Sequence, residues 1–134
     1  PNRIALFSLL VPEYDEALAF FLRIGFECRE DTDLGNGKRW VRIAPRGGET
    51  ELLLARAVGD RQSATIGSKA VVGLAGLETA DFEADHLRMQ AEGVIFESEP
   101  RNEPYGRVAV WKDPWGNRWD LIEFAKSDRG CTGS

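Results

Sequence analysis

The sequence predicts an α+β fold made of two copies of one strand–helix–strand–strand–strand unit. The elements expected before residue 57 follow that order, and the same order begins again after residue 68. Gly25 and Gly93, which end the two expected helices, lie 68 residues apart, and Tyr14 and Phe82 keep the same spacing near the helix starts. A repeat at a fixed spacing indicates two related structural units.

The first half opens with residues 4–11, a nearly continuous apolar run of strand length that Pro12 ends. Residues 13–23 place apolar side chains at helical spacing, with acidic residues in the first turn, and Gly25 is a typical helix stop. Alternating patterns and intervening turns predict three further strands, over residues 26–30, 39–44 and 51–55.

The second half follows a polar stretch, residues 57–68, which has no apolar period and is expected to be a linker or loop. Residues 82–92 form the next expected helix, with Thr79 as its N-cap. Strands are expected over residues 70–77, 94–96, 107–111 and 118–123, with a loop over 100–106 and a polar tail from 126.

Residues 113–117 carry a strong turn signal directly before the last expected strand. The Asp113 carboxylate can accept hydrogen bonds from nearby backbone N–H groups, Pro114 presets φ, and Gly116 and Asn117 tolerate a positive φ. In the strand that follows, a period of two puts Arg118 and Asp120 on one face. That face is either solvated surface or the lining of a concave site.

Composition and charge exclude several classes of function. The net charge of −5 argues against a nucleic-acid binder, which needs clustered Lys and Arg. Cys28 and Cys131 lie too far apart in the sequence to indicate a disulfide framework, so we expect a reducing, cytoplasmic location. No apolar run approaches the roughly 20 residues that span a bilayer, and we expect no membrane partner.

Three segments together resemble the vicinal oxygen chelate superfamily, which holds glyoxalase I, ring-cleaving dioxygenases, fosfomycin-modifying enzymes and bleomycin-resistance proteins. They are residues 11–26, the pair Arg39-Trp40, and residues 113–121. The resemblance implies a single glyoxalase-like domain over residues 1–134, made of two βαβββ modules at about 1–56 and 69–125, with linker 57–68 and tail 126–134. It also implies that the curved mixed sheets form an open cup and that the chain is a homodimer.

In glyoxalase-like members of that superfamily, four His, Gln or Glu side chains hold a divalent metal in the cup. Only the fourth matching position carries a carboxylate here, and one carboxylate is too few for a tight transition-metal site. The cofactor is therefore unknown, and a divalent metal stays possible without support from these positions. The four positions that match the metal ligands of the family are Leu6, Leu53, one of Val72, Gly73 or Leu74, and Asp120.

Other groups offer little catalytic chemistry. The single histidine, His86, lies within the second expected helix and is interpreted as a structural or surface residue. Cys28 and Ser8 have no histidine partner that the sequence identifies, so no nucleophilic arrangement is indicated.

Alternation along the strands predicts which side chains face the cup. If Val41 and Ile43 form the core, their neighbours face the cavity, and the same argument takes Val108 and Val110 as core. An aromatic and apolar cup with a few polar groups suits a flat or amphipathic small molecule. The alternative is that the tryptophans are mainly core packing. The expected ligand-binding residues are Trp40, Arg42, Leu53, Arg107, Trp111 and Arg118.

Two functions follow from the resemblance and the residues. The first is a protein that binds a small organic molecule in its cup without the usual tight metal site. The alternative is a metal-dependent glyoxalase-like lyase or isomerase, or a dioxygenase, with Asp120 as the catalytic residue or metal ligand. A metal-free enzyme that uses Asp120 as a base lies between the two, so whether the chain is an enzyme stays open.

Overall fold

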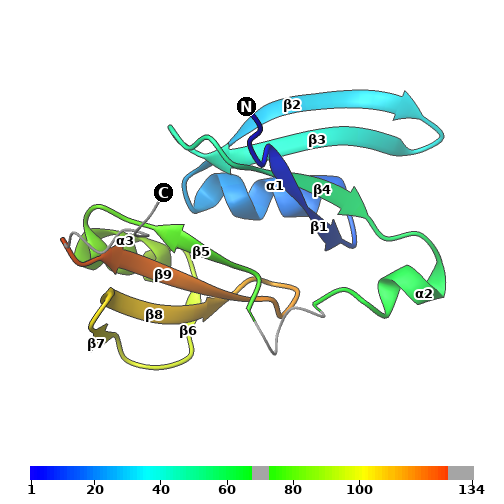
Figure 1. The fold of residues 1–134 in the computed structure, drawn as a ribbon. Helices are drawn as coiled ribbons and strands as arrows, with labels where there is room; N and C mark the ends of the chain where they lie inside the picture. The colour runs from blue at the N-terminus through cyan, green and yellow to red at the C-terminus, as the bar shows by residue number, and fades with distance from the viewer. Residues whose placement is uncertain (68–72, 127–134) are drawn as a thin grey trace. The chain divides into compact units, whose positions relative to one another are not determined.

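The computed structural model describes residues 1–67 and 73–126, and the chain divides into two compact units, residues 1–68 and 69–134 (Figure 1). Each unit carries one mixed β-sheet and an α-helix of ten residues. The α+β class predicted from the sequence is confirmed. None of the helices that the structure describes has the length and apolar character that a membrane-spanning helix needs.

The first unit contains a four-stranded sheet, called sheet 1 below, in the order β1-β4-β3-β2. Strand β1 pairs with β4 in parallel, whereas β4, β3 and β2 pair antiparallel. The elements are β1 (Leu6–Val11), α1 (Tyr14–Arg23), β2 (Phe26–Gly35), β3 (Lys38–Pro45), β4 (Glu51–Arg56) and the short helix α2 (Gly59–Ser63).

Helix α1 packs against β2, β3 and β4 on one face of sheet 1 (Figure 1). Its apolar side chains recur at helical spacing, so Ala17 and Phe21 become fully buried on the side that meets the sheet. Val41, Ile43 and Leu54 fill the same core from β3 and β4. The expectation that Val41 and Ile43 face the helix is confirmed, and the opposite face of sheet 1 carries their strand neighbours.

The second unit contains a five-stranded sheet, called sheet 2 below, in the order β5-β9-β8-β6, with β7 paired to β8. Strand β5 pairs with β9 in parallel and the other pairs are antiparallel. The elements are β5 (Ala75–Glu78), α3 (Phe82–Ala91), β6 (Ile95–Phe96), β7 (Arg101–Glu103), β8 (Gly106–Lys112) and β9 (Arg118–Phe124).

Two segments expected to be irregular contain regular structure. Within residues 57–68 the chain forms α2, and the Gln62 side chain accepts a hydrogen bond from the Val58 N–H, at 2.8 Å, which satisfies a donor at the helix start. Within residues 100–106, β7 forms because Arg101 and Glu103 pair across a tight turn with Val108 and Gly106 of β8. The expected strand over 70–77 is seen from Ala75, and its residues 70–72 lie outside the described part.

Helix α3 begins at Phe82, as the sequence predicts, but its N-cap is a different residue. Asp81, not Thr79, is the N-cap, and its carboxylate accepts a hydrogen bond from the Ala84 N–H at 3.2 Å. Thr79 instead supports the cap: its hydroxyl accepts from the Asp81 N–H and donates to the Asp85 carboxylate.

The turn at residues 113–117 is confirmed, and Asp113, its first residue, has only 4% of its surface exposed. Its carboxylate accepts from the N–H groups of Trp115 and Asn117, at 3.0 and 2.9 Å. It also accepts from Asn117 Nδ2 at 2.9 Å and from Trp119 Nε1 at 3.1 Å. One buried carboxylate therefore joins the turn to β9.

Candidate functional site

The face of sheet 1 that points away from α1, called the open face of sheet 1, carries the three residues predicted to face the cup from this unit. Arg42 of β3 pairs with Leu53 of β4, and Leu53 pairs with Ser8 of β1. Trp40 lies two residues before Arg42 on the same strand and therefore on the same face. Trp40, Arg42 and Leu53 are all half-buried, so this face combines apolar surface with one guanidinium group.

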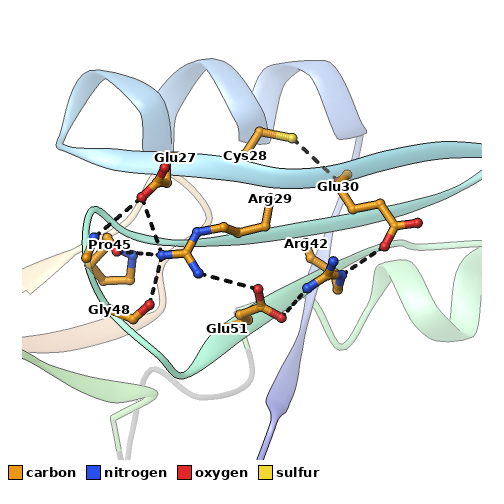
Figure 2. Close-up of polar contacts among 9 residues, drawn as sticks. Glu27, Cys28, Arg29, Glu30, Arg42, Pro45, Gly48 and Glu51 are labelled. Atoms are coloured by element: carbon orange, nitrogen blue, oxygen red, sulfur yellow. Dashed lines mark hydrogen bonds and ion pairs between the residues drawn. The ribbon is translucent and has the colours of Figure 1, made fainter.

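Two carboxylates hold the Arg42 guanidinium (Figure 2). Its Nε donates to Glu30 of β2 at 3.0 Å, and its Nη1 donates to Glu51 of β4 at 2.5 Å. Glu30 is the direct cross-strand partner of Arg42, and alternation along β4 puts Glu51 on the same face as Leu53. Three strands thus fix the position of one cationic side chain.

A second guanidinium extends the same network (Figure 2). Arg29 Nη1 lies 3.6 Å from the second oxygen of Glu51, and Arg29 Nη2 lies 3.4 Å from Glu27. Arg29 Nη2 also donates to the Gly48 carbonyl at 2.8 Å, which ties the strand to the loop before β4. Glu51 is only 13% exposed, so the carboxylate shared by the two arginines is the most buried member.

The network shifts the pKa values of Glu30 and Arg42. The Thr32 hydroxyl and the Arg42 guanidinium hold the pKa of Glu30 below its ordinary value. Hydrogen bonds to Glu51, which has the larger effect, and to Glu30 raise the pKa of Arg42. Glu30, Glu51 and Arg29 were not predicted from the sequence, because alternation along β4 puts Glu51 on the face of Leu53 but does not distinguish it from a surface residue.

In the second unit, Asp120 and Arg118 lie on the same face of sheet 2, as predicted. That face points away from α3, because Glu123 on the other face accepts a hydrogen bond from the Phe82 N–H at the start of α3. Arg118 binds Glu97 in an ion pair of 2.9 Å. Asp120 is exposed, and its carboxylate has no hydrogen bond or ion pair within the described part of the chain.

The prediction that Arg107 and Trp111 share the face of Asp120 is wrong. The register pairs Trp111 with Trp119 and Arg107 with Glu123, which puts both residues on the face covered by α3. Trp111 is fully buried and its ring stacks on Trp119 at 4.9 Å. Arg107 lies over the Phe82 ring and pairs with Glu83 of α3. The face of sheet 2 that points away from α3, called the open face of sheet 2, instead carries Val108 and Val110, opposite Ile122 and Asp120, and both valines are buried.

The residues at the superfamily's metal-ligand positions do not fit a divalent metal. Leu6 and Leu53 lie on the open face of sheet 1, and neither side chain has a donor atom. Gly73 and Leu74 also offer none, and Val72 lies outside the described residues. Across residues 1–67 and 73–126, no three His, Cys, Asp or Glu side chains gather in a metal-binding group. His86 lies between the rings of Phe82 and Phe96.

A family model and an uncharacterised relative each match most of the chain. The model of the Glyoxalase/Bleomycin resistance protein/Dioxygenase superfamily matches residues 3–121. An uncharacterised protein of Shewanella frigidimarina (strain NCIMB 400) is 40% identical over 121 residues, which cover 87% of this chain and 90% of that protein.

Solved structures are similar over nearly the whole chain. The crystal structure of UcmS2 has a TM-score of 0.80 and 27% identity, and covers 91% of this chain and 98% of its own. TnmS3, an antibiotic binding protein from Streptomyces sp. CB03234, has a TM-score of 0.73 and 31% identity, with 93% and 98% covered. The chain belongs to the Glyoxalase/Bleomycin resistance protein/Dioxygenase superfamily.

Proposed function

We propose that this protein binds a small organic molecule against the open face of sheet 1, without a tight metal site. The observation that carries the proposal is the chemistry of that face. Leu6 and Leu53 stand at positions where glyoxalase-like relatives would need metal ligands, and Trp40 lies on the same face. A half-buried surface that combines leucine side chains and an indole with a few fixed polar groups is typical of a ligand-binding wall.

The named activity of a relative supports this choice of function over catalysis. TnmS3 is called an antibiotic binding protein, and it shares 31% identity with this chain over nearly its whole length. We therefore propose that the ligand is of the size and amphipathic character of an antibiotic. The alternative, a lyase or dioxygenase that uses Asp120, has one supporting observation, which is the exposed Asp120 carboxylate without a partner in the described residues.

The test is a binding screen with a matched pair of variants. A panel of antibiotics of several chemical classes is titrated into the protein, and binding is followed by tryptophan fluorescence and by the shift in melting temperature. We expect at least one compound to bind, and Trp40→Ala to weaken it by roughly tenfold or more, because a stacking aromatic contact is lost. Leu22→Ala is the control, since Leu22 is an exposed apolar residue of α1, away from the open face.

Metal analysis separates the two functions. The protein is purified without chelator or nickel resin, incubated with zinc, nickel, manganese or iron, desalted, and its metal content measured. We expect far less than one metal per chain. If the protein retains nearly one metal per chain and the Asp120→Ala variant does not, the result would favour the enzyme alternative. An antibiotic panel that gives no binding and no melting shift would contradict the binding function.

A further inference from the structure

We propose that Arg42 is a fixed hydrogen-bond donor for an uncharged ligand, so that the ligand is a flat molecule with a carbonyl oxygen and not a carboxylate or a phosphate. This inference rests on the proposed function, because it names the chemical class of the molecule that binds there. It goes further because it assigns Glu30 and Glu51 as the residues that disfavour a negatively charged ligand.

The donors that remain on Arg42 are the two N–H groups of Nη2 and one of Nη1, because two of its five N–H groups are used. Nε donates to Glu30 and Nη1 to Glu51, so both ends of the guanidinium plane are held. Nη2 has no hydrogen bond to any residue that the structure describes. A guanidinium whose plane is fixed loses little entropy when it forms one more hydrogen bond. A carbonyl oxygen, which accepts without needing a counter-charge, is the matching ligand group.

The charge around Arg42 disfavours an anion. The network contains three carboxylates, Glu27, Glu30 and Glu51, and two guanidinium groups, Arg29 and Arg42, which gives a net charge of −1. An anionic ligand near Arg42 would meet the field of Glu30 and Glu51 at short range, where partial burial weakens screening by water. A free arginine attracts carboxylates and phosphates, whereas this one is already neutralised.

The neighbour of Arg42 supplies the flat surface. Trp40 and Arg42 are two residues apart on β3, which separates their Cα atoms by about 7 Å along the strand. The Trp40 ring makes no stacking contact with an aromatic side chain among the described residues. A fused ring system placed on the indole therefore reaches the free Arg42 donor with an oxygen on its edge.

The test uses three matched probes that differ in one property each. Xanthone is flat and neutral and has a carbonyl; xanthene lacks the carbonyl; xanthone-2-carboxylate adds a negative charge. Dissociation constants are measured at pH 7.5 by tryptophan fluorescence quenching. We expect xanthone to bind roughly tenfold tighter than xanthene, because one hydrogen bond to a charged donor contributes about that much affinity. We expect the carboxylate to bind roughly tenfold more weakly than xanthone.

Two variants attribute these differences to residues. Glu30→Gln keeps the side-chain shape and removes one charge, so the penalty on the carboxylate probe should shrink several-fold. Glu92→Gln, an exposed residue at the end of α3, changes the net charge equally and should leave the penalty unchanged. Arg42→Gln should remove the preference for xanthone over xanthene, and circular dichroism confirms that each variant is folded.

The outcomes separate this inference from the proposed function. Three results would overturn the role of Arg42. Xanthone and xanthene could bind equally well, or the carboxylate probe could bind tightest of the three. The weaker binding of the carboxylate probe relative to xanthone could also be unchanged by Glu30→Gln. Antibiotic binding without any xanthone binding would also overturn it while leaving the binding function intact. No binding of antibiotics or of any xanthone would instead contradict the proposed function.

Discussion

Replacing Asp113 by alanine should destabilise the second unit more than any surface substitution, because this carboxylate is the acceptor for four buried or half-buried donors. Asp113 is 4% exposed, Asn117 1% and Trp119 3%, so water does not replace a lost partner without a change in structure. The variant leaves Asn117 Nδ2 and Trp119 Nε1 without their acceptor. Each unsatisfied buried donor costs about 1–3 kcal/mol, which gives a loss of about 4 kcal/mol for the two side chains.

The free energy of unfolding is measured by urea denaturation, and the melting temperature by circular dichroism. For a chain of this length, a loss of about 4 kcal/mol lowers the melting temperature by roughly 12–20 °C. Asp113→Asn should lose about half as much, since it keeps one acceptor oxygen but turns an amide N–H₂ toward other donors.

Asp120→Ala is the matched control for Asp113→Ala. Asp120 lies seven residues later, is exposed, and has no polar partner in the described part of the chain, so its removal should change stability by no more than about 0.5 kcal/mol. A loss below about 1 kcal/mol for Asp113→Ala would refute the claim that its hydrogen bonds hold the turn to β9. Equal losses for the two variants would refute it as well.

Three further results are expected. Gly106→Ala should cost about 3 kcal/mol or more in urea denaturation, because a Cβ at this φ of 151° would meet the carbonyl oxygen of Glu123 across the ladder; a neutral result would contradict the β8–β9 register. Arg118 lowers the pKa of Glu97, so this pair stabilises the fold above pH 4.5 and the effect is lost as the pH falls further. The stability gap between wild type and Glu97→Gln should therefore close between pH 6 and pH 3, and a constant gap would exclude the ion pair as its cause. Analytical ultracentrifugation should give twice the mass of one chain, as expected for a homodimer, and a monomer would contradict that proposal.

The order of elements was predictable because each strand and helix carries its own pattern. Residues 13–23 have a strong helical period and a buried apolar stripe, and the structure places α1 there. The β7 hairpin was not predictable in the same way, since Arg101–Glu103 holds no apolar residue and is a strand only through its pairing with β8. Strands of that kind are fixed by a neighbour and not by their own sequence.

The face of β8 was assigned wrongly because its local pattern is ambiguous. Val108, Ala109, Val110 and Trp111 are all buried, so alternation has no polar side to indicate which face points outward. The internal repeat held the missing signal. A spacing of 68 residues aligns Val110 with Arg42, and a residue on the open face of one unit predicts the same face in the other.

The ion network was missed for a different reason. Single charges on a strand are usually solvated, so nothing in β2 or β4 taken alone distinguishes Glu30 or Glu51 from surface residues. Only the register brings them to Arg42: Glu30 is its cross-strand partner on β2, and Glu51 lies two residues from Leu53 on β4. Contacts that depend on three strands at once cannot be deduced from patterns within each strand.

The same repeat shows how the two units have diverged. Where sheet 1 carries Trp40 and Arg42 on its open face, sheet 2 carries Val108 and Val110 at the aligned positions. The indole and the fixed guanidinium therefore occur in the first unit alone at these positions, and the second unit has two buried valines there. Because a valine neither donates a hydrogen bond nor stacks on a flat ring, exchanging the pair is informative: Trp40→Val with Arg42→Val should abolish the preference for a carbonyl-bearing ligand. The fold should survive, since the second unit already tolerates valine at both places.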